Sequence, residues 1–216
     1  MEITWLGHSC FKLRGRTASV VTDPPGKSTG YTIGRPTANV VTISHDHEGH
    51  NNAKAVTGSP RVIQGPGEFE VAGVLIRGAH TFHDPENGAE LGRNTAYVME
   101  IDELVICHLG DIGHIPTAEQ VEELSGADIL LAPVGGDTTI GGAAAAETVS
   151  LLGPKLVIPM HYGTPASKGK LESIDTFLKE IGAPNAMDER QPKLSITKTT
   201  LPQETKVQVL DYKGRA

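Results

Sequence analysis

Short apolar and alternating segments fill the first half of the chain and predict β-strands. Runs rich in Val, Ile and Thr are separated by Gly, Pro, Asp and Ser, which is typical of short strands joined by tight turns. One of these runs, NVVTI, is apolar on both faces, as a strand buried inside a sheet would be. The strands expected here are Glu2–Leu6, Cys10–Arg14, Ser19–Thr22, Asn39–Ile43, Arg61–Gln64, Glu68–Val71, Val74–Arg77, Thr95–Ile101 and Leu104–Cys107.

In the second half, strands alternate with helical patterns. Thr117 followed by acidic residues predicts a helix over 117–125, because an N-cap hydroxyl and early acids favour a helix start. The other expected elements are the helices Ala143–Leu152 and Lys170–Ile181 and the strands Ile129–Ala132, Leu156–Ile158, Ser195–Thr199 and Lys206–Leu210. This order predicts an α/β (α+β) fold in which helices cover two sheets, in a single domain over residues 1–216.

Composition narrows the classes of function. The 216 residues hold 19 Lys and Arg against 26 Asp and Glu, and this net charge of −7 argues against a nucleic-acid binder. Cys10 and Cys107 are too few for a disulfide framework or a four-thiolate zinc site, and both lie in apolar strands as reduced core residues would. No apolar run approaches the roughly 18–20 residues of a membrane span. No export signal is visible at the N-terminus, so we expect a cytoplasmic protein with no membrane partner.

Histidine is the residue type that points to chemistry. Three of the nine histidines, His45, His47 and His50, follow directly after the buried strand that ends at Ile43. In an extended or loop backbone His45 and His47 present their rings on one side, and Gly49 eases the turn that brings His50 to them. Imidazole suits Zn, Fe, Ni and Cu, so this segment predicts a metal site. A solvated polar loop is the alternative.

Further donors follow other apolar strands. They are His80 and His83 after Val74–Arg77, His108 and Asp111 after Leu104–Cys107, and His161 after Leu156–Ile158. Any one of them alone would be read as a turn residue or a cap. Their recurrence at strand ends indicates ligands gathered at one edge of a sheet.

The ordered motifs resemble those of the metallo-β-lactamase superfamily. They include H-x-H-x-G-H at 45–50, HLGD ending in Asp111 and PMHY with His161. The segments LGHSCF (6–11), GRNTAYVMEID (92–102), ICHLGDIGH (106–114), LLAPVGGDTT (130–139) and IPMHYGT (158–164) resemble more closely the L-ascorbate-6-phosphate lactonase-like branch. The resemblance implies a four-layer αββα sandwich with one or two divalent metal ions in a cleft at the sheet edges.

The resemblance also implies roles for individual residues. Its first metal ion would be held by His45, His47 and His83, and its second by His50, Asp111 and His161, with Asp111 bridging the two. Asp23 would stand behind the metals and orient a ligand histidine. His8 either reaches the site in the same way or stabilises its own turn through a hydrogen bond. Zinc is the natural metal, although Mn or Fe also suits a set of donors without thiolate.

Other residues are candidates for the lining of the cleft. Gly135, Gly136 and Thr138 lie in the loop after the strand Ile129–Ala132. The glycines of this loop would let a ligand approach the backbone closely, or the loop is simply a strand-to-helix turn. Tyr162 would donate a hydrogen bond to a substrate oxygen, or pack at the sheet edge. His80 is the weaker alternative to His83 as a metal ligand, and His108 would line its strand. His114 is a candidate only because it lies close in sequence to His108 and Asp111.

Gly49 departs from the resembled motif, H-x-H-x-D-H. In that motif the Asp ligates the second metal and helps to manage the proton of the attacking water, and glycine can do neither. Three outcomes follow: a second metal held more weakly by His50, Asp111 and His161, a single occupied metal site, or a fold that has lost much of its hydrolytic power.

The leading hypothesis is a hydrolase that opens an ester, lactone or phosphoester bond with water activated by metal, so that no protein nucleophile is needed. Its substrate would be a small molecule, and an anion is compatible because bound cations make the cleft locally positive. A non-catalytic metal- or ligand-binding protein is the alternative that Gly49 favours. A nuclease is disfavoured by the acidic charge, and the sequence leaves a homo-oligomer open.

Overall fold

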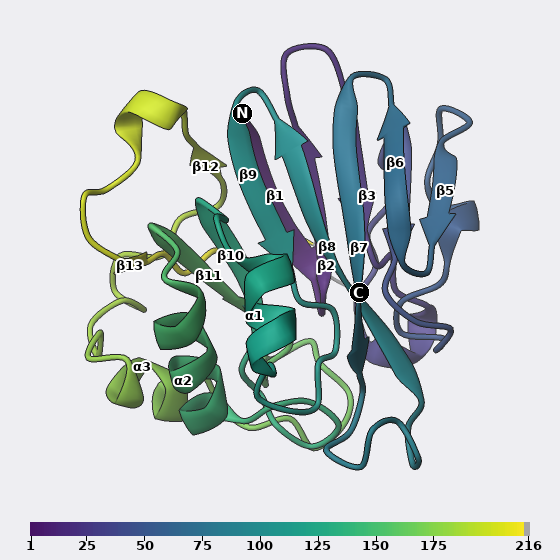
Figure 1. The fold of residues 1–216 in the computed structure, drawn as a ribbon. Coiled ribbons are helices and arrows are strands. Elements are labelled where there is room, and N and C mark those ends of the chain that lie inside the picture. Colours follow the sequence, from purple (N-terminus) through teal and green to yellow (C-terminus); the bar gives the residue numbers. More distant parts are fainter. Residues whose placement is uncertain (214–216) are drawn as a thin grey trace.

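Two mixed β-sheets face each other across an apolar core (Figure 1). The structure is a computed structural model in which residues 1–213 are described. The first sheet has the strand order β12-β1-β2-β3-β4-β5, and the second has the order β13-β11-β10-β9-β8-β7-β6. The fold is therefore the α/β sandwich of two sheets that the order of the sequence elements predicted.

The first sheet is built mainly from the N-terminal strands. They are β1 (Glu2–Gly7), β2 (Cys10–Arg14), β3 (Ser19–Thr22), β4 (Val40–Ile43), β5 (Arg61–Gln64) and the short β12 (Leu194–Ser195). β1, β2 and β3 are antiparallel neighbours, whereas β3, β4 and β5 run parallel. The parallel part places the end of β4, where the histidine segment begins, at the same edge as the end of β3.

The second sheet combines an antiparallel and a parallel half. Its strands are β6 (Gly67–Val71), β7 (Val74–Phe82), β8 (Arg93–Ile101), β9 (Leu104–His108), β10 (Ile129–Pro133), β11 (Leu156–Met160) and β13 (Lys206–Val207). β6 to β9 pair antiparallel, and β9, β10, β11 and β13 pair parallel. The carboxyl ends of β9, β10 and β11 therefore meet at one edge of the sheet.

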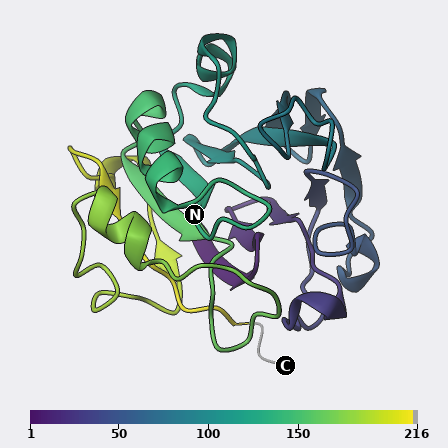
Figure 2. The ribbon, with the colours of Figure 1, turned by 90° about the horizontal axis from the view of Figure 1, so that it is seen from below.

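Three α-helices lie on one side of the described chain, away from the N-terminal strands (Figure 2). They are α1 (Ala118–Leu124), α2 (Gly142–Leu152) and α3 (Asp175–Glu180). Thr117 caps α1 in a reciprocal capping box with Gln120, which is the start that the sequence predicted. Between β3 and β5 the chain forms only the one-turn 3-10 helices η1 (Lys27–Thr29) and η2 (Ala53–Ala55).

The core fills the space between the sheets and joins them close to the strand ends. Trp5 and Phe11 from the first sheet and Tyr97 and Ile106 from the second are all buried in one cluster. The Tyr97 hydroxyl donates a hydrogen bond to the carbonyl oxygen of Ile43, at 3.0 Å. Because a buried phenol needs a partner, this bond ties β8 to the end of β4. The segment that carries the histidines is thus anchored to both sheets.

Three expected boundaries were wrong. Helix Lys170–Ile181 is reduced to α3, because the backbone of Glu172 pairs instead with Gly135 and Gly163 and holds residues 170–172 extended. The expected strand Ser195–Thr199 stops at Ser195, since a 3-10 turn, η3 (Lys198–Thr200), follows it. Strand Lys206–Leu210 is also shorter and ends at Val207. In the first case tertiary hydrogen bonds override a local pattern, and in the second a local turn ends the strand.

Strands β7 and β9 are longer than expected, which changes the position of two histidines. β7 continues to Phe82, so His80 lies within the strand rather than after it. β9 includes His108 as its last residue. No helix among residues 1–213 is long and apolar enough to cross a membrane.

Adjacent leucines at the end of α2 give a matched test of core packing. Leu152 is 6% exposed and packs in the core, whereas Leu151 is 46% exposed. We expect Leu152→Ala to lower the free energy of unfolding by about 2–3 kcal/mol, because it removes buried methyl groups and leaves a cavity. Leu151→Ala should change it by less than about 0.5 kcal/mol. Urea denaturation of both variants measures the difference, and equal losses would contradict this packing.

The two thiols should be inert while the chain is folded. Burial raises the pKa of Cys107 to about 12 and raises the pKa of Cys10 well above its usual range. A thiol reacts as its thiolate, so at pH 8, far below these pKa values, neither should react with a disulfide reagent such as DTNB. Both should react after unfolding in guanidinium chloride. Rapid labelling of the native protein would show that one thiol is accessible.

Candidate functional site

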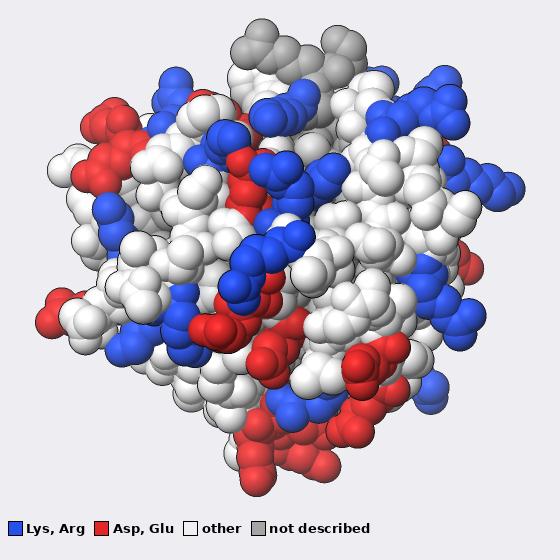
Figure 3. All heavy atoms as spheres, turned by 90° about the horizontal axis from the view of Figure 1, so that it is seen from above, with Lys and Arg blue, Asp and Glu red and all other residues white. Residues whose placement is uncertain are grey.

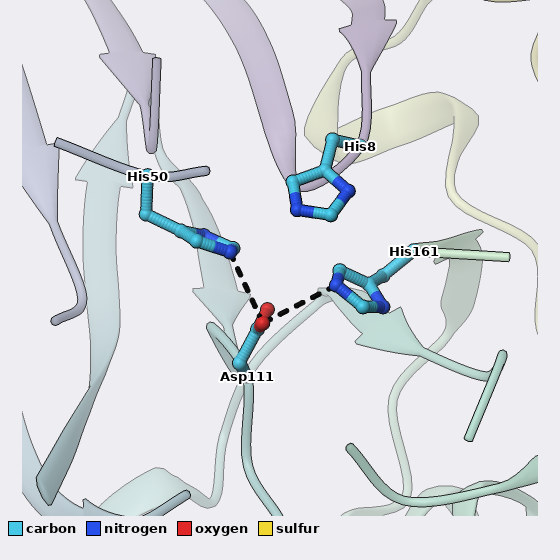
Figure 4. Close-up of side chains that lie close together, drawn as sticks. All are labelled: His8, His50, Asp111 and His161. Carbon is cyan, nitrogen blue, oxygen red and sulfur yellow. Dashed lines mark ion pairs between the residues drawn. The ribbon is translucent and has the colours of Figure 1, made fainter. Parts of the chain in front are cut away.

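Seven donor side chains from different strands converge at one end of the sheets. His45, His47 and His50 follow β4, and His83 follows β7. Asp111 and His161 follow β9 and β11, and His8 lies in the turn between β1 and β2. Their nitrogen and oxygen atoms form two groups, each with its donor atoms within 4.8 Å of one another: His8, His50, Asp111 and His161, and His45, His47 and His83. Figure 4 shows the first group.

The Asp111 carboxylate stands between the two groups. Its Oδ2 lies 3.1 Å from His50 Nε2, 3.2 Å from His161 Nε2 and 3.8 Å from His83 Nε2. Its Oδ1 accepts a hydrogen bond from the Ser9 hydroxyl at 3.1 Å, which leaves Oδ2 free to face the histidines. Ligands about 2.0–2.1 Å from a tetrahedral zinc ion are about 3.3 Å apart, close to these separations. The position is the one that a bridging carboxylate would need.

The second group consists of imidazole rings only. The ring centroid of His45 is 4.6 Å from that of His47 and 4.5 Å from that of His83. His45 and His83 are buried, and His47 is exposed at the mouth. His45 Nε2 is buried and has no hydrogen-bond partner among the described residues. A buried nitrogen without a partner is costly, and a metal ion would satisfy it.

A buried carboxylate behind the site orients two of these histidines. Asp23 accepts hydrogen bonds from the Ser44 backbone N–H at 2.7 Å and the Ser44 hydroxyl at 2.5 Å, and its Oδ2 lies 3.1 Å from His50 Nδ1. Because the Ser44 hydroxyl donates to Asp23, it can accept from His45 Nδ1 at 2.9 Å. Both rings then carry the proton on Nδ1 and turn Nε2 toward the cleft. The resemblance implied that Asp23 would orient a ligand histidine, and the structure places its carboxylate against His50.

The charges of this centre are strongly coupled. Burial opposes a charge on His50, but Asp111 and Asp23 outweigh it and raise the pKa of His50 to about 10. Burial, together with the neighbouring His50, lowers the pKa of His45 to about 3. Burial would raise the pKa of Asp111, but His161 and His50 hold it well below its usual range. The pocket therefore favours positive charge between Asp23 and Asp111, and a cation bound at His50 Nε2 would replace a proton.

Hydrogen bonds also fix the loops around His83 and Asp111. Asp84 is buried and its carboxylate accepts from four backbone N–H groups in residues 86–91. The Asn94 side chain donates to the Leu109 carbonyl at 2.8 Å and accepts from the Asp111 N–H at 3.0 Å. No sequence pattern indicates these supporting roles, because acidic and amide side chains in loops are common.

Three other histidines lie outside the two donor groups. His80 packs edge-on against Phe82, with ring centroids 4.8 Å apart, and does not line the cleft. His108 is fully buried; its Nε2 lies 2.8 Å from the Ser9 carbonyl oxygen and its Nδ1 accepts from the Gly110 N–H. His114 Nε2 accepts from the Phe82 N–H. The lining role expected for His80 and His108 is thus a packing and turn-supporting role instead.

The cleft itself has a volume of about 210 Å³. Beyond the donor groups, the residues that line it are Gly49, Asp137, Thr138, Lys168, Gly169 and Leu171. Thr138 lies where the sequence placed it, but Gly135, Gly136 and Tyr162 do not line the cleft. A Cβ at Gly135 would meet the His161 carbonyl oxygen at 2.2 Å, so that glycine permits close packing of two backbones. Tyr162 is buried against Trp5, with ring centroids 5.1 Å apart.

The sequence did not predict that Lys168 would line the cleft or that the His8 ring would join a donor group. Lys168 belongs to the 163–170 loop, whose Gly and Ser content gave no sign of a site. His8 was expected behind the metals or in a turn hydrogen bond, and the structure places its ring with His50, Asp111 and His161. The motif LGHSCF was a signal for His8, but only the fold brings that turn to the strand ends.

The chain is similar to known proteins both in sequence and in fold. Residues 2–161 match the profile of the β-lactamase superfamily domain. A UPF0173 metal-dependent hydrolase of Korarchaeum cryptofilum is 31% identical, with 84% of this chain and 92% of that protein covered.

Two solved structures of hydrolases are similar to this one in fold. A proposed Zn-dependent hydrolase of the metallo-β-lactamase superfamily from Thermotoga maritima is 41% identical, with a TM-score of 0.79 over 98% of this chain and 99% of that one. Igni18, a metallo hydrolase from Ignicoccus hospitalis, has a TM-score of 0.66 at 19% identity, over 99% of this chain and 95% of that one, and so shares the fold.

Removing the negative charge of Asp23 should weaken metal binding without removing a donor that faces the cleft. We expect Asp23→Asn to lower the affinity for Zn²⁺ by about 10–100-fold, since the amide can no longer fix the tautomers of His50 and His45. Asparagine tolerates the positive φ of 36° at this position, so the fold should persist. Competition with a chromophoric chelator measures the affinity. Asp128→Asn, which alters the Lys198 pair away from the cleft, is the control; equal losses in both variants would contradict this role.

Proposed function

Because this chain belongs to the metallo-β-lactamase superfamily and to its UPF0173 family of metal-dependent hydrolases, we propose that its two donor groups hold two divalent metal ions. We propose further that the protein uses them to hydrolyse an ester, lactone or phosphoester bond of a small anionic substrate. The observation that carries this proposal is the single carboxylate oxygen, Asp111 Oδ2, within 3.1–3.8 Å of imidazole nitrogens from both donor groups. A carboxylate in that position suits a pair of neighbouring ions.

The donor chemistry fits the metals. Every side chain in the two groups offers nitrogen or oxygen, and imidazole predominates, which favours Zn²⁺ while Mn²⁺ or Fe²⁺ is also compatible. When bound, such ions lower the pKa of a coordinated water to about 7 and polarise the bond under attack. The chain then needs no serine or cysteine nucleophile, in agreement with the burial of both thiols.

The protein's own contribution is to hold the donors in position before they bind. Asp23 and Ser44 fix the tautomers of His45 and His50, so their Nε2 atoms face the cleft without rearrangement. Ser9 and Asn94 hold Asp111 from two sides. Donors positioned in advance avoid the cost of reorganisation at each turnover.

The walls of the cleft support a small, negatively charged substrate. A volume of about 210 Å³ is at the lower end for ligand sites, so only part of a larger molecule would fit. Lys168 at the rim offers a cation, and Thr138 offers a hydroxyl for a phosphate or carboxylate group. A phosphorylated lactone of the type handled by the L-ascorbate-6-phosphate lactonase-like branch remains a prediction within this class.

A nuclease function is less well supported. On the face at the end of the sheets away from the cleft, Lys and Arg side chains are interspersed with Asp and Glu (Figure 3), and the net charge is −7. Nucleic-acid binding depends on a basic surface that neutralises phosphates. A non-catalytic metal-binding protein is the second candidate, because Gly49 lacks the carboxylate of the usual motif.

Loss of a ligand from either group should abolish turnover. We expect His45→Ala and Asp111→Asn to reduce hydrolysis of activated ester, lactone and phosphodiester substrates below detection, because each removes a donor to one or both ions. The control is His114→Gln, since His114 lies outside both groups. Metal content of each variant is measured in parallel. Turnover that survives both ligand variants, or wild-type protein that binds no metal after reconstitution with Zn²⁺, would contradict the proposal.

A further inference from the structure

His8 is the one residue of the first donor group that the sequence did not assign to a metal. Its ring centroid lies 4.8 Å from that of His50 and 4.2 Å from that of His161. Figure 4 shows the His8 ring above Asp111, on the same side as the ion pairs that Asp111 makes with His50 and His161. The four side chains surround one space, and each turns a donor atom toward it.

The absence of a side chain at position 49 makes room for this ring. A Cβ built on Gly49 would lie 3.0 Å from His8 Nε2 and 3.5 Å from His8 Cδ2. The distance of 3.0 Å is shorter than an ordinary contact between non-bonded atoms, so the ring would have to shift to admit a side chain at position 49. A carboxylate at position 49 and the imidazole of His8 would therefore compete for the same place beside His50.

The backbone of His8 is held in an uncommon conformation. Its φ is 54°, and the preceding Gly7 has a φ of 107°. The His8 carbonyl oxygen accepts hydrogen bonds from the Trp5 indole at 2.9 Å and the His161 N–H at 3.2 Å. Non-glycine residues in this region cost free energy and persist only where surrounding contacts enforce them, often at functional sites. The turn therefore fixes the backbone from which the ring extends before any ligand binds.

A hydrogen bond within the turn does not explain the position of the ring. His8 Nδ1 is buried without a partner among the described residues, and Nε2 faces Gly49 at the cleft. Within residues 1–213, no hydrogen bond from either ring nitrogen therefore accounts for the position of this half-buried ring. Its Nε2 lies at the cleft, where it can coordinate a cation beside Asp111.

We propose that His8 is the fourth protein ligand of the second metal ion, in the place that the motif's aspartate would occupy. This inference rests on the metal centre of the proposed function. The second ion would then be held by His8, His50, Asp111 and His161, which is a three-imidazole, one-carboxylate set. Replacing a carboxylate with a neutral imidazole makes the centre more positive by one charge. It also shifts the preference of the site from Mn²⁺ toward Zn²⁺.

The experiment counts bound metal in four forms of the full-length chain. Wild-type protein, His8→Asn, Gly49→Asp and the double variant are dialysed against Zn²⁺ and analysed by mass spectrometry for metal per chain. Asparagine is chosen at position 8 because it tolerates positive φ and its amide is a poor zinc ligand. We expect wild type to bind about two equivalents and His8→Asn about one, since the His45, His47 and His83 group is left intact.

The double variant separates a ligand from a packing residue. His8→Asn combined with Gly49→Asp should regain about two equivalents, because the shorter side chain at position 8 leaves room for the new carboxylate. Gly49→Asp alone should not exceed wild type, since both groups compete for one place. Thermal unfolding and circular dichroism of the metal-free proteins verify that all four forms fold.

Two results would overturn the assignment. One is His8→Asn that retains about two equivalents with unchanged affinity, in which case the ring only packs. The other is wild-type protein that binds about one equivalent, which is lost in His45→Ala but kept in His8→Asn. The first result leaves the proposed function unchanged, and the second reduces its centre from two ions to one. Metal-dependent hydrolysis itself fails only if the wild-type chain binds no metal or if turnover survives loss of the His45 and Asp111 ligands.

Discussion

Two buried carboxylates among imidazole rings need compensating positive charge, and the rest of the structure depends on that need. Asp23 and Asp111 are buried in the described chain, and His50 lies between them with one nitrogen toward each. A buried anion without compensating positive charge is very costly. A proton on His50 meets part of that need, and metal ions would meet it more fully. The free energy of the fold and the binding of cations are therefore linked in the same few side chains.

The architecture meets this requirement by ending strands at one place. Parallel pairing aligns the end of β4 with that of β3 in one sheet and the ends of β9, β10 and β11 in the other. Contacts between the sheets, such as the hydrogen bond from Tyr97 to Ile43, bring these strand ends together. Three residues there, His8, Asp23 and His161, have positive φ although none is glycine. Such strain persists because the core and the hydrogen bonds around the turns outweigh it. Rigid strands and strained turns together place donors from distant parts of the chain.

Gly49 takes on a different meaning in three dimensions. In the sequence motif, Gly49 stands in place of an aspartate, which suggests a weaker site for the second metal ion. In the folded chain it is the gap into which His8 fits, with no room for a Cβ at ordinary distance. The position of His8 depends on a hairpin turn some forty residues earlier in the chain, and no pattern around position 49 contains that information.

The sequence by itself determined the strands, the order of the motifs and most of the donors, because hydrophobic periodicity and residue chemistry are local properties. It predicted His83 rather than His80 as a ligand, and the structure places His83 with His45 and His47. It failed for segments such as 170–174 and for the surroundings of His8, Lys168 and Tyr162. Those depend on contacts between residues far apart in the chain. Only the packing of one sheet against the other decided which side chains share a cavity and which are buried beside it.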